Sequence, residues 1–204
     1  SCPRRSPRPP VSVVILAGGR GERLGQDKAT LELNGATLLQ RALDALAPLS
    51  DDLIVVLRHD QELRAPSARI VRDLEPFAGV LAGMAAGLGA AQHAWSFMMA
   101  CDMPFVNPRL VRYMYAQRSG YDIVVPRVPA GLEPLHALYH RRCLRPVSRA
   151  LLGGERRLIS FYASLRVRYI EGSESQALDP QELSFFNINT PEDVALALGW
   201  LAAL

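Results

Sequence analysis

The chain has 204 residues, of which 49% are hydrophobic and 21% charged, and its formal net charge is +3. This composition is typical of a globular protein that buries a full core, and it excludes a disordered or collagen-like chain. The apolar stretches are too short or too rich in glycine to span a bilayer, so we expect no membrane partner.

Part of the positive charge lies at the start of the chain. Arg4, Arg5 and Arg8 stand among prolines, which oppose regular structure. We predict a disordered, basic, proline-rich tail over residues 1–10 and one folded domain over residues 11–204. Without the tail the charge is about neutral, so no nucleic-acid partner is expected. The tail lacks the apolar core of a signal peptide, and the three cysteines are far apart, so we expect a cytoplasmic protein.

From residue 11 onward, short apolar runs alternate with stretches of helical periodicity. The predicted strands cover residues 11–17, 53–57, 68–71, 95–101, 122–125, 135–140, 167–171 and 185–188. The predicted helices cover residues 37–47, 80–92, 108–119, 141–152, 158–164 and 191–201. This alternation predicts an α/β fold with a single doubly wound, mostly parallel, Rossmann-like sheet and helices on both faces. Ligands of such folds bind beyond the carboxyl ends of the strands, so polar residues that follow apolar runs are the first candidates for a site.

A glycine-rich loop follows the first predicted strand. Residues 18–28 hold four glycines and three cations, which are Arg20, Arg23 and Lys28. Glycine lets backbone N–H groups approach phosphate oxygens closely, and the cations supply the opposite charge. The loop matches neither the dinucleotide fingerprint, because leucine stands at position 24, nor the P-loop. It therefore predicts a phosphate site of another kind, with a surface loop of solvated cations as the alternative.

Two carboxylates stand where apolar runs end. Asp102 follows the run at residues 95–101, and Asp73 follows Ile70 and Val71. A carboxylate that faces bound phosphates needs a cation between them, and Mg²⁺ takes one or two carboxylates and completes its shell with water and phosphate oxygens. Asp102 is therefore the candidate metal ligand. The alternative for both residues is that they cap a turn.

The loop, read as Leu16-Ala-Gly-Gly-Arg-x-x-Arg-Leu-Gly-x-Asp-Lys28, resembles the signature of the nucleoside-triphosphate transferase family. Members of this family join a nucleotide to a phosphorylated acceptor, and the resemblance implies a fold of the nucleotide-diphospho-sugar transferase type. Four further segments resemble its MobA-like branch, the molybdenum cofactor guanylyltransferases. These are Leu33-Asn-Gly35, Gly79-Val-Leu-Ala-Gly83, Cys101-Asp-Met-Pro104 and Phe186-Asn-Ile-Asn-Thr-Pro-Glu-Asp193. The matches occur in family order and span nearly everything after residue 11.

The resemblance implies roles for individual residues. It assigns catalysis to Lys28, Arg23 and Asp102 and places Mg²⁺ on Asp102. The nucleotide-binding set that it implies is Leu16, Ala17, Gly18, Gly19, Lys28, Asp73, Gly79, Gly83 and Asp102. One segment departs from the family: some relatives end their second strand in an asparagine that contacts the nucleotide, whereas this chain reads Val56-Leu-Arg58. We expect that contact to be missing or to come from the backbone.

The activity implied by the resemblance is transfer of GMP from GTP to the phosphate of molybdopterin, with release of pyrophosphate. Two anions must approach each other, so the barrier is largely electrostatic and no protein nucleophile is required. GTP and molybdopterin are then the substrates, and a cofactor-delivery protein or a molybdoenzyme is a candidate partner. The enzyme alternative is a cytidylyltransferase acting on molybdopterin or an isoprenoid alcohol phosphate, and the non-enzyme alternative is a GTP-binding sensor. Related cytidylyltransferases carry alanine where this chain has Gly18, which favours guanine.

Two residues in the second half of the chain are candidates for the acceptor. His136 stands in a segment that resembles the stretch with which relatives meet the acceptor, and an ordinary position on an edge strand is the alternative. In a strand it lies about 13 Å from His140, too far for a shared zinc ion. Arg156 stands in a Gly-Glu-Arg-Arg run that resembles the family and is a candidate for the pterin phosphate. Its alternative is the start of a solvated helix.

Two asparagines complete the set of acceptor candidates. Asn187 and Asn189 alternate with apolar residues and would share one face of the predicted strand at 185–188. Either could assist the metal or the pterin, and the alternative is that they cap the next helix. That helix has a strong start signal, with Thr190 as N-cap and Pro191 at the first helical position.

Overall fold

The structure is a computed structural model that describes residues 9–19, 21, 23–73 and 79–203. Residues 1–8 of the predicted basic tail therefore lie outside the described residues, as does Arg20 of the glycine-rich loop. Pro10, the last residue of the predicted tail, accepts a hydrogen bond at its carbonyl from the Tyr115 hydroxyl at 3.3 Å.

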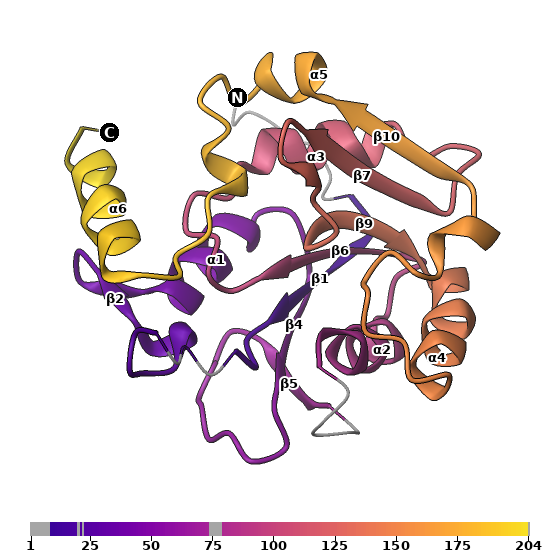
Figure 1. The fold of residues 1–204 in the computed structure, drawn as a ribbon, viewed down its shortest axis with the longest axis horizontal. Helices are drawn as coiled ribbons and strands as arrows, with labels where there is room; N and C mark the ends of the chain where they lie inside the picture. Colours follow the sequence, from indigo (N-terminus) through magenta and orange to yellow (C-terminus); the bar gives the residue numbers. More distant parts are fainter. Residues whose placement is uncertain (1–8, 20, 22, 74–78, 204) are drawn as a thin grey trace, which may run out of the picture.

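An eight-stranded sheet forms the centre of the molecule (Figure 1). Its strands are β1 Val11–Leu16, β4 Asp52–Leu57, β5 Arg69–Arg72, β6 Trp95–Ala100, β7 Ile123–Val128, β8 Gly131–Leu132, β9 His136–His140 and β10 Val167–Glu171. They lie in the order β10-β7-β9-β6-β1-β4-β5, with β8 paired to β7. The pairs among β6, β1, β4 and β5 and the β10–β7 pair are parallel, whereas β9 is antiparallel to both neighbours. The predicted α/β fold with a mostly parallel sheet is confirmed.

Helices cover both faces of this sheet (Figure 1). Helices α1 Leu38–Leu46 and α3 Pro108–Ala116 pack on one face, and α2 Val80–Ala90 and α4 Leu144–Leu152 pack on the other. The short helix α5 Gly172–Gln176 follows β10, and α6 Pro191–Ala203 packs in a separate hydrophobic cluster. A small hairpin of β2 Glu32–Leu33 and β3 Ala36–Thr37 lies beside α6. No helix in the described ranges is long and apolar enough to cross a membrane.

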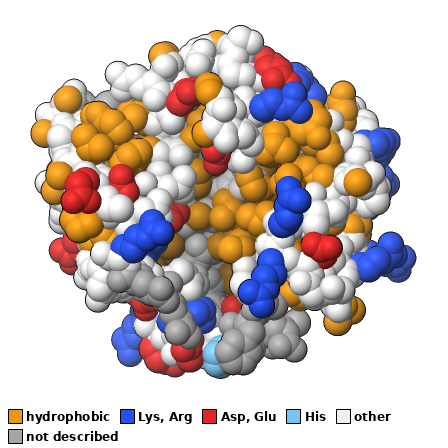
Figure 2. Space-filling model, viewed as in Figure 1, with side chains coloured by type: hydrophobic (Ala, Val, Ile, Leu, Met, Phe, Trp, Pro, Cys, Tyr) orange, Lys and Arg blue, Asp and Glu red, His pale blue; other side chains and the backbone are white. Residues whose placement is uncertain are grey.

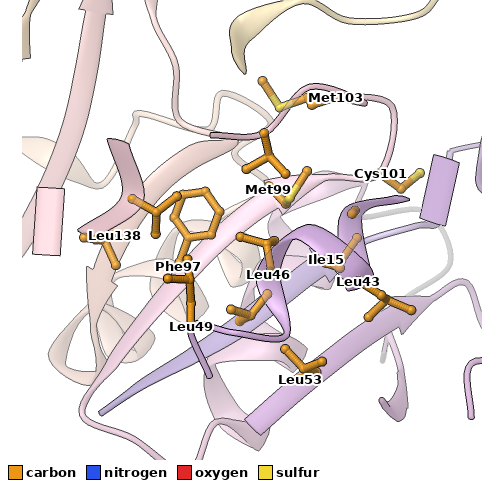
Figure 3. Close-up of a cluster of buried hydrophobic side chains, with 14 of the residues drawn as sticks. Ile15, Leu43, Leu46, Leu49, Leu53, Phe97, Met99, Cys101, Met103 and Leu138 are labelled. Carbon is orange, nitrogen blue, oxygen red and sulfur yellow. The ribbon is translucent and has the colours of Figure 1, made fainter. Parts of the chain in front are cut away.

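Strand β1 divides its side chains between two cores. Val13 and Ile15 pack below α1 and α3, in the cluster drawn in Figure 3. Val14 packs on the opposite face, below α2 and α4. All three side chains are fully buried, and burying one such side chain contributes about 1.5–3 kcal/mol. Because both faces are covered, the strand needs apolar residues at nearly every position, as its sequence shows.

Two predicted elements are wrong. Residues 158–164 do not form an α-helix, and only Tyr162–Ser164 form a 3-10 turn. Phe161 and Tyr162 are both buried in this segment. Residues 185–188 do not join the sheet either: Leu183–Phe185 form a 3-10 turn, and the extended segment that follows meets the end of β6 through the Ile188 N–H, which donates to the Asp102 carbonyl at 2.9 Å.

Candidate functional site

A cavity of about 260 Å³ opens at the carboxyl ends of β1, β4 and β6. The glycine-rich loop and the first turn of α2 complete its wall, and we call it the nucleotide cavity. All of the predicted nucleotide-binding residues line it except Ala17, which is fully buried below the loop. Residues separated by up to 86 positions, from Leu16 to Asp102, are thus brought to one edge of the sheet, as expected for a sheet of this kind.

The Lys28 ammonium connects two segments at this cavity. Its Nζ atom donates to Asp102 Oδ2 at 2.7 Å and to Asn189 Oδ1 at 2.6 Å. Lys28 begins the 3-10 turn Lys28–Thr30, Asp102 follows β6, and Asn189 immediately precedes the residue that caps α6. The Lys28 and Asp102 side chains are each only 15% exposed, so water screens their attraction less than it would at an open surface.

The other oxygen of Asp102 is unsatisfied. Asp102 Oδ1 is buried and has no hydrogen-bond partner among the described residues. Leaving a buried polar atom without a partner costs about 1–3 kcal/mol, and more for a charged group, so a cation at this position would stabilise the carboxylate. No group of three or more His, Cys, Asp and Glu residues in the described part of the chain could hold a metal by itself. One carboxylate supplemented by water and phosphate oxygens is a donor set that suits a hard divalent cation.

Two glycines, one in the glycine-rich loop and one at the start of α2, have backbone conformations that larger residues rarely adopt. Gly21 has a φ of +57°, and a Cβ there would lie 2.0 Å from the Gln26 carbonyl oxygen, so the loop cannot close around a larger residue. Gly79 has a φ of +66° and is the N-cap of α2. The first N–H groups of a helix lack intrahelical partners and carry partial positive charge, and α2 directs this end at the cavity. The wall therefore favours a bound anion such as a phosphate.

Arg58 fastens the glycine-rich loop to the end of β4. Its Nη1 atom donates to the Gly18 carbonyl at 2.9 Å and lies 3.4 Å from Asp27 Oδ1. The buried Gln61 side chain donates to the Ala17 carbonyl at 3.0 Å. These donors tie the two ends of the loop, at Ala17 and Gly18 and at Asp27, to the segment after β4. The sequence drew attention to this segment only as a departure from the family pattern, and did not predict the role of Arg58.

The family model of the MobA-like NTP transferase domain matches residues 13–168. The chain belongs to this family. It is 39% identical to a probable molybdenum cofactor guanylyltransferase of Pelotomaculum thermopropionicum, over 90% of each chain. It is 37% identical to the molybdenum cofactor guanylyltransferase of Desulfosudis oleivorans, over 92% of this chain and 94% of the relative. The protein is thus a nucleotidyltransferase of the MobA-like type.

Solved structures agree with this assignment. The molybdopterin-guanine dinucleotide biosynthesis protein A of Archaeoglobus fulgidus superposes with a TM-score of 0.84 at 29% identity, covering 95% of this chain and 100% of that one. The 2-C-methyl-D-erythritol 4-phosphate cytidylyltransferase of Thermus thermophilus superposes with a TM-score of 0.71 at 22% identity, over 95% and 99% of the two chains. The similarity to the Archaeoglobus protein extends the family relationship to a solved structure. The similarity to the Thermus cytidylyltransferase shows a shared fold.

Two residues that were predicted to contact the nucleotide, Asp73 and Arg23, lie in different places relative to the nucleotide cavity. Asp73 lines the nucleotide cavity, and its Oδ1 also accepts from the His59 N–H at 3.1 Å, across from the end of β4. The turn that Asp73 was alternatively expected to cap lies at residues 74–78, outside the described residues. Arg23 is exposed in a turn of the loop and is not part of the cavity wall.

His136 corrects one expectation for the acceptor side. Strand β9 lies between β6 and β7, so the edge-strand alternative is wrong. The ring is fully buried, with its centroid 5.0 Å from that of Phe97 and 5.1 Å from that of Phe185. Burial lowers the pKa of His136 to about 3, so the ring is neutral at ordinary pH. Its side chain lines neither the nucleotide cavity nor the larger cavity described below, which corrects the expectation of direct contact with an acceptor.

The other acceptor candidates fall in three different places. Arg156 is exposed in the loop after α4, away from both cavity walls, and the helix that it was expected to begin does not form. Asn187 donates from Nδ2 to the Phe185 carbonyl at 3.0 Å. Asn189 contacts Lys28, as described above. Helix α6 is capped by Thr190, whose Oγ1 accepts from the Asp193 N–H at 3.3 Å, so the predicted N-cap is correct and the asparagine side chains do not cap it.

Proposed function

We propose that this nucleotidyltransferase transfers GMP from GTP to the phosphate of molybdopterin. The observation that carries the proposal is the contact of Lys28 with Asp102 at a cavity walled by the glycine-rich loop and the α2 N-terminus. The names of the relatives at 37–39% identity favour guanylyl transfer over cytidylyl transfer. The family assignment argues against a sensor that only binds GTP.

The nucleotide cavity offers distinct surfaces for the two ends of GTP. Leu16, Val56 and Leu57 supply apolar side chains from the ends of β1 and β4, which suit a base and ribose. Gly18, Gly19 and the start of α2 supply backbone N–H groups, which suit phosphates. We place the α-phosphate beside Lys28 and Asp102, because that is where the cation and the unpartnered carboxylate oxygen lie.

We assign to Asp102 a Mg²⁺ ion bound jointly with the phosphates. The ion supplies positive charge that offsets the phosphate oxygens when it is bound. Asp102 contributes the oxygen that has no partner within the described chain, and Lys28 holds the other oxygen in place. Fixing the carboxylate in this way before the substrate arrives reduces the reorganisation required during the reaction.

The reaction then depends on position and charge. An oxygen of the acceptor phosphate attacks the α-phosphorus of GTP, the bond from that phosphorus to the bridging oxygen breaks, and pyrophosphate leaves. The acceptor phosphate is already ionised near neutral pH and needs no base. Lys28 lies where it can offset the charge that accumulates on the α-phosphate. Cys101 also lines the cavity, but burial raises the pKa of its thiol, so it remains protonated and is not a nucleophile.

The experiment that tests this proposal is a transfer assay with purified protein, molybdopterin and Mg²⁺, using GTP or CTP in parallel. We expect pyrophosphate release and a product of the mass of molybdopterin guanine dinucleotide with GTP, and at least tenfold lower kcat/KM with CTP. Preference for CTP would support the cytidylyltransferase alternative. Tight GTP binding without any transfer would support the sensor.

A further inference from the structure

A second cavity, of about 660 Å³, lies between α6, the β7–β8 hairpin and the 3-10 turn Leu183–Phe185. Its wall is mainly apolar and includes the rings of Phe185, Phe186 and Trp200, so we call it the aromatic cavity. Figure 2 shows hydrophobic side chains on either side of the hollow next to α6. Its volume falls in the range of pockets that hold molecules of several fused rings.

The walls of the aromatic cavity and of the nucleotide cavity include residues that are close together in the chain. Glu133 lines the aromatic cavity, and Leu135, two residues later, lines the nucleotide cavity. Phe186 lines the aromatic cavity, and Asn189, three residues later, accepts from Lys28. Three residues of extended chain span at most about 11 Å, so the aromatic wall lies within that distance of the Asn189 backbone. A molecule could therefore occupy the aromatic cavity and still place a phosphate near Lys28.

Two carboxylates set the polarity of the aromatic cavity. Glu182 lines it, and Glu182 Oε1 is buried without a hydrogen-bond partner in the described part of the chain. Glu133 lines it from the hairpin side, and burial raises the pKa of this carboxyl to about 7 with no other group contributing. Carboxylates accept N–H bonds and repel anions. An occupant would therefore place N–H donors here and direct its own negative groups elsewhere.

A pterin ring meets these requirements. It is flat and aromatic, so it can stack against Phe186 and Trp200, whose rings are already 4.8 Å apart in an edge-to-face arrangement. Its amino group and the neighbouring ring N–H form a pair of donors that one carboxylate accepts together. The phosphate of a phosphorylated pterin is repelled by the Glu182 carboxylate and attracted by Lys28, which orients the molecule across the two cavities.

We propose that the aromatic cavity binds the pterin ring of the acceptor, with Glu182 and Glu133 accepting its N–H donors and its phosphate directed toward Lys28. The identity of the acceptor rests on the proposed function, whereas the cavity and its carboxylates do not. Glu182 and Glu133 then bind the acceptor, and replacing them should leave the binding of GTP unchanged.

The test compares Glu182→Gln and Glu133→Gln with Glu32→Gln, a control at an exposed position on β2. Glutamine keeps the size of the side chain but loses the charge and one acceptor oxygen. We expect KM for molybdopterin to rise at least tenfold in the first two variants, while KM for GTP stays within twofold of the wild-type value. The control should change neither constant.

A third variant, Ala130→Trp, tests the aromatic cavity even if the glutamate variants fail to fold. Ala130 is exposed on the β7–β8 turn at the rim of the aromatic cavity, so a larger side chain can enter the cavity without disturbing the core. We expect it also to raise KM for molybdopterin at least tenfold. The inference is overturned if all three variants keep that constant within twofold of the Glu32→Gln value.

Failure of the proposed function gives a different result. A wild-type protein that transfers nothing from GTP to molybdopterin contradicts the proposed function alone. The cavity is then tested with 6-hydroxymethylpterin, whose binding is followed by its own fluorescence. Weaker binding to Ala130→Trp and Glu182→Gln than to the Glu32→Gln control supports the inference, and equal or undetectable binding to all of them contradicts it.

Discussion

Lys28 and Asp102, 74 residues apart, form an ion pair of 2.7 Å between the loop after β1 and the end of β6. Lys28 is also the only lysine in the chain, in which 22 of the 23 basic residues are arginines. An ammonium is a compact, strongly hydrated point charge, whereas a guanidinium is a wide planar fork. The pair therefore joins the chain's one lysine to a carboxylate that is, among the described residues lining this cavity, the one with an unsatisfied buried oxygen.

Two substitutions of Lys28 distinguish the contribution of its charge from the contribution of its shape. We expect Lys28→Met to weaken GTP binding at least tenfold and to lower the free energy of unfolding by about 2 kcal/mol, because Asp102 then loses its partner in a partly buried site. Lys28→Arg retains the charge, but its planar fork fits the two acceptor oxygens poorly, so kcat should still fall at least tenfold. Calorimetric titration with GTP, urea unfolding and the transfer assay measure the three quantities. Wild-type kcat in Lys28→Arg would show that only the charge matters.

The single lysine also permits a chemical test. A reagent selective for lysine amines modifies Lys28 alone, apart from the N-terminal amine, because no other lysine exists. We expect GTP with Mg²⁺ to protect Lys28 and the modified protein to lose transfer activity. Mass spectrometry of peptides locates the label. Equal labelling of Lys28 with and without saturating GTP would remove it from the phosphate site.

Asp102→Asn should act mainly on the metal. The variant keeps the shape of the side chain but loses its negative charge, so we expect kcat to fall by about 10²–10³ and half-saturation to require more Mg²⁺. GTP binding measured without Mg²⁺ should change much less. Asp44→Asn, at an exposed position on α1, is the matched control. Unchanged activity at low Mg²⁺ in Asp102→Asn would exclude Asp102 as the metal ligand.

We expect Arg58 to contribute to the binding of GTP and not to the chemical step. Arg58→Met removes the donors to Gly18 and Asp27 and leaves a chain of similar length, so the loop gains freedom that GTP binding must then restrict. We expect KM for GTP to rise about tenfold with kcat within threefold of wild type. Arg112→Met, at an exposed position on α3, is the control. A fall in kcat without a change in KM would contradict this role.

The nucleotide side of the site was predictable because it depends on local sequence. The apolar run of β1 identifies a strand covered on both faces, the glycines after it identify a loop for an anion, and Asp102 follows β6, one of the two strands that pair with β1. Parallel strands bring their carboxyl ends to one edge, so these separate signals converge without knowledge of the tertiary structure.

The acceptor side was less predictable because it depends on contacts between distant segments. The alternation of Asn187 and Asn189 with apolar residues is typical of a strand, yet the segment joins no strand of the sheet, and the Ile188 N–H donates to the carbonyl of Asp102, just beyond β6. Strand β9, which carries His136, is antiparallel to its neighbours β6 and β7. The direction of a strand cannot be predicted from the periodicity of its sequence. Glu182 belongs to no motif, and its place in the aromatic cavity follows from the turn at Leu183–Phe185.

His136 makes stability depend on pH. In the unfolded chain the pKa is near 6.5, and burial lowers it to about 3 in the folded protein. Between these values the unfolded chain binds the additional proton, so stability is full above about pH 6.5 and falls as the pH falls toward 3, by up to about 1.4 kcal/mol per pH unit.

Substitution of His136 by leucine should remove this contribution. We expect the loss of unfolding free energy from pH 7 to pH 5, measured by urea unfolding, to be smaller by about 2 kcal/mol in His136→Leu than in wild type. His59→Gln, at an exposed position after β4, should behave as wild type. Because neither ring nitrogen of His136 has a hydrogen-bond partner in the described part of the chain, no such bond opposes the change. Identical pH dependence in wild type and His136→Leu would mean that the ring takes up its proton in the folded state.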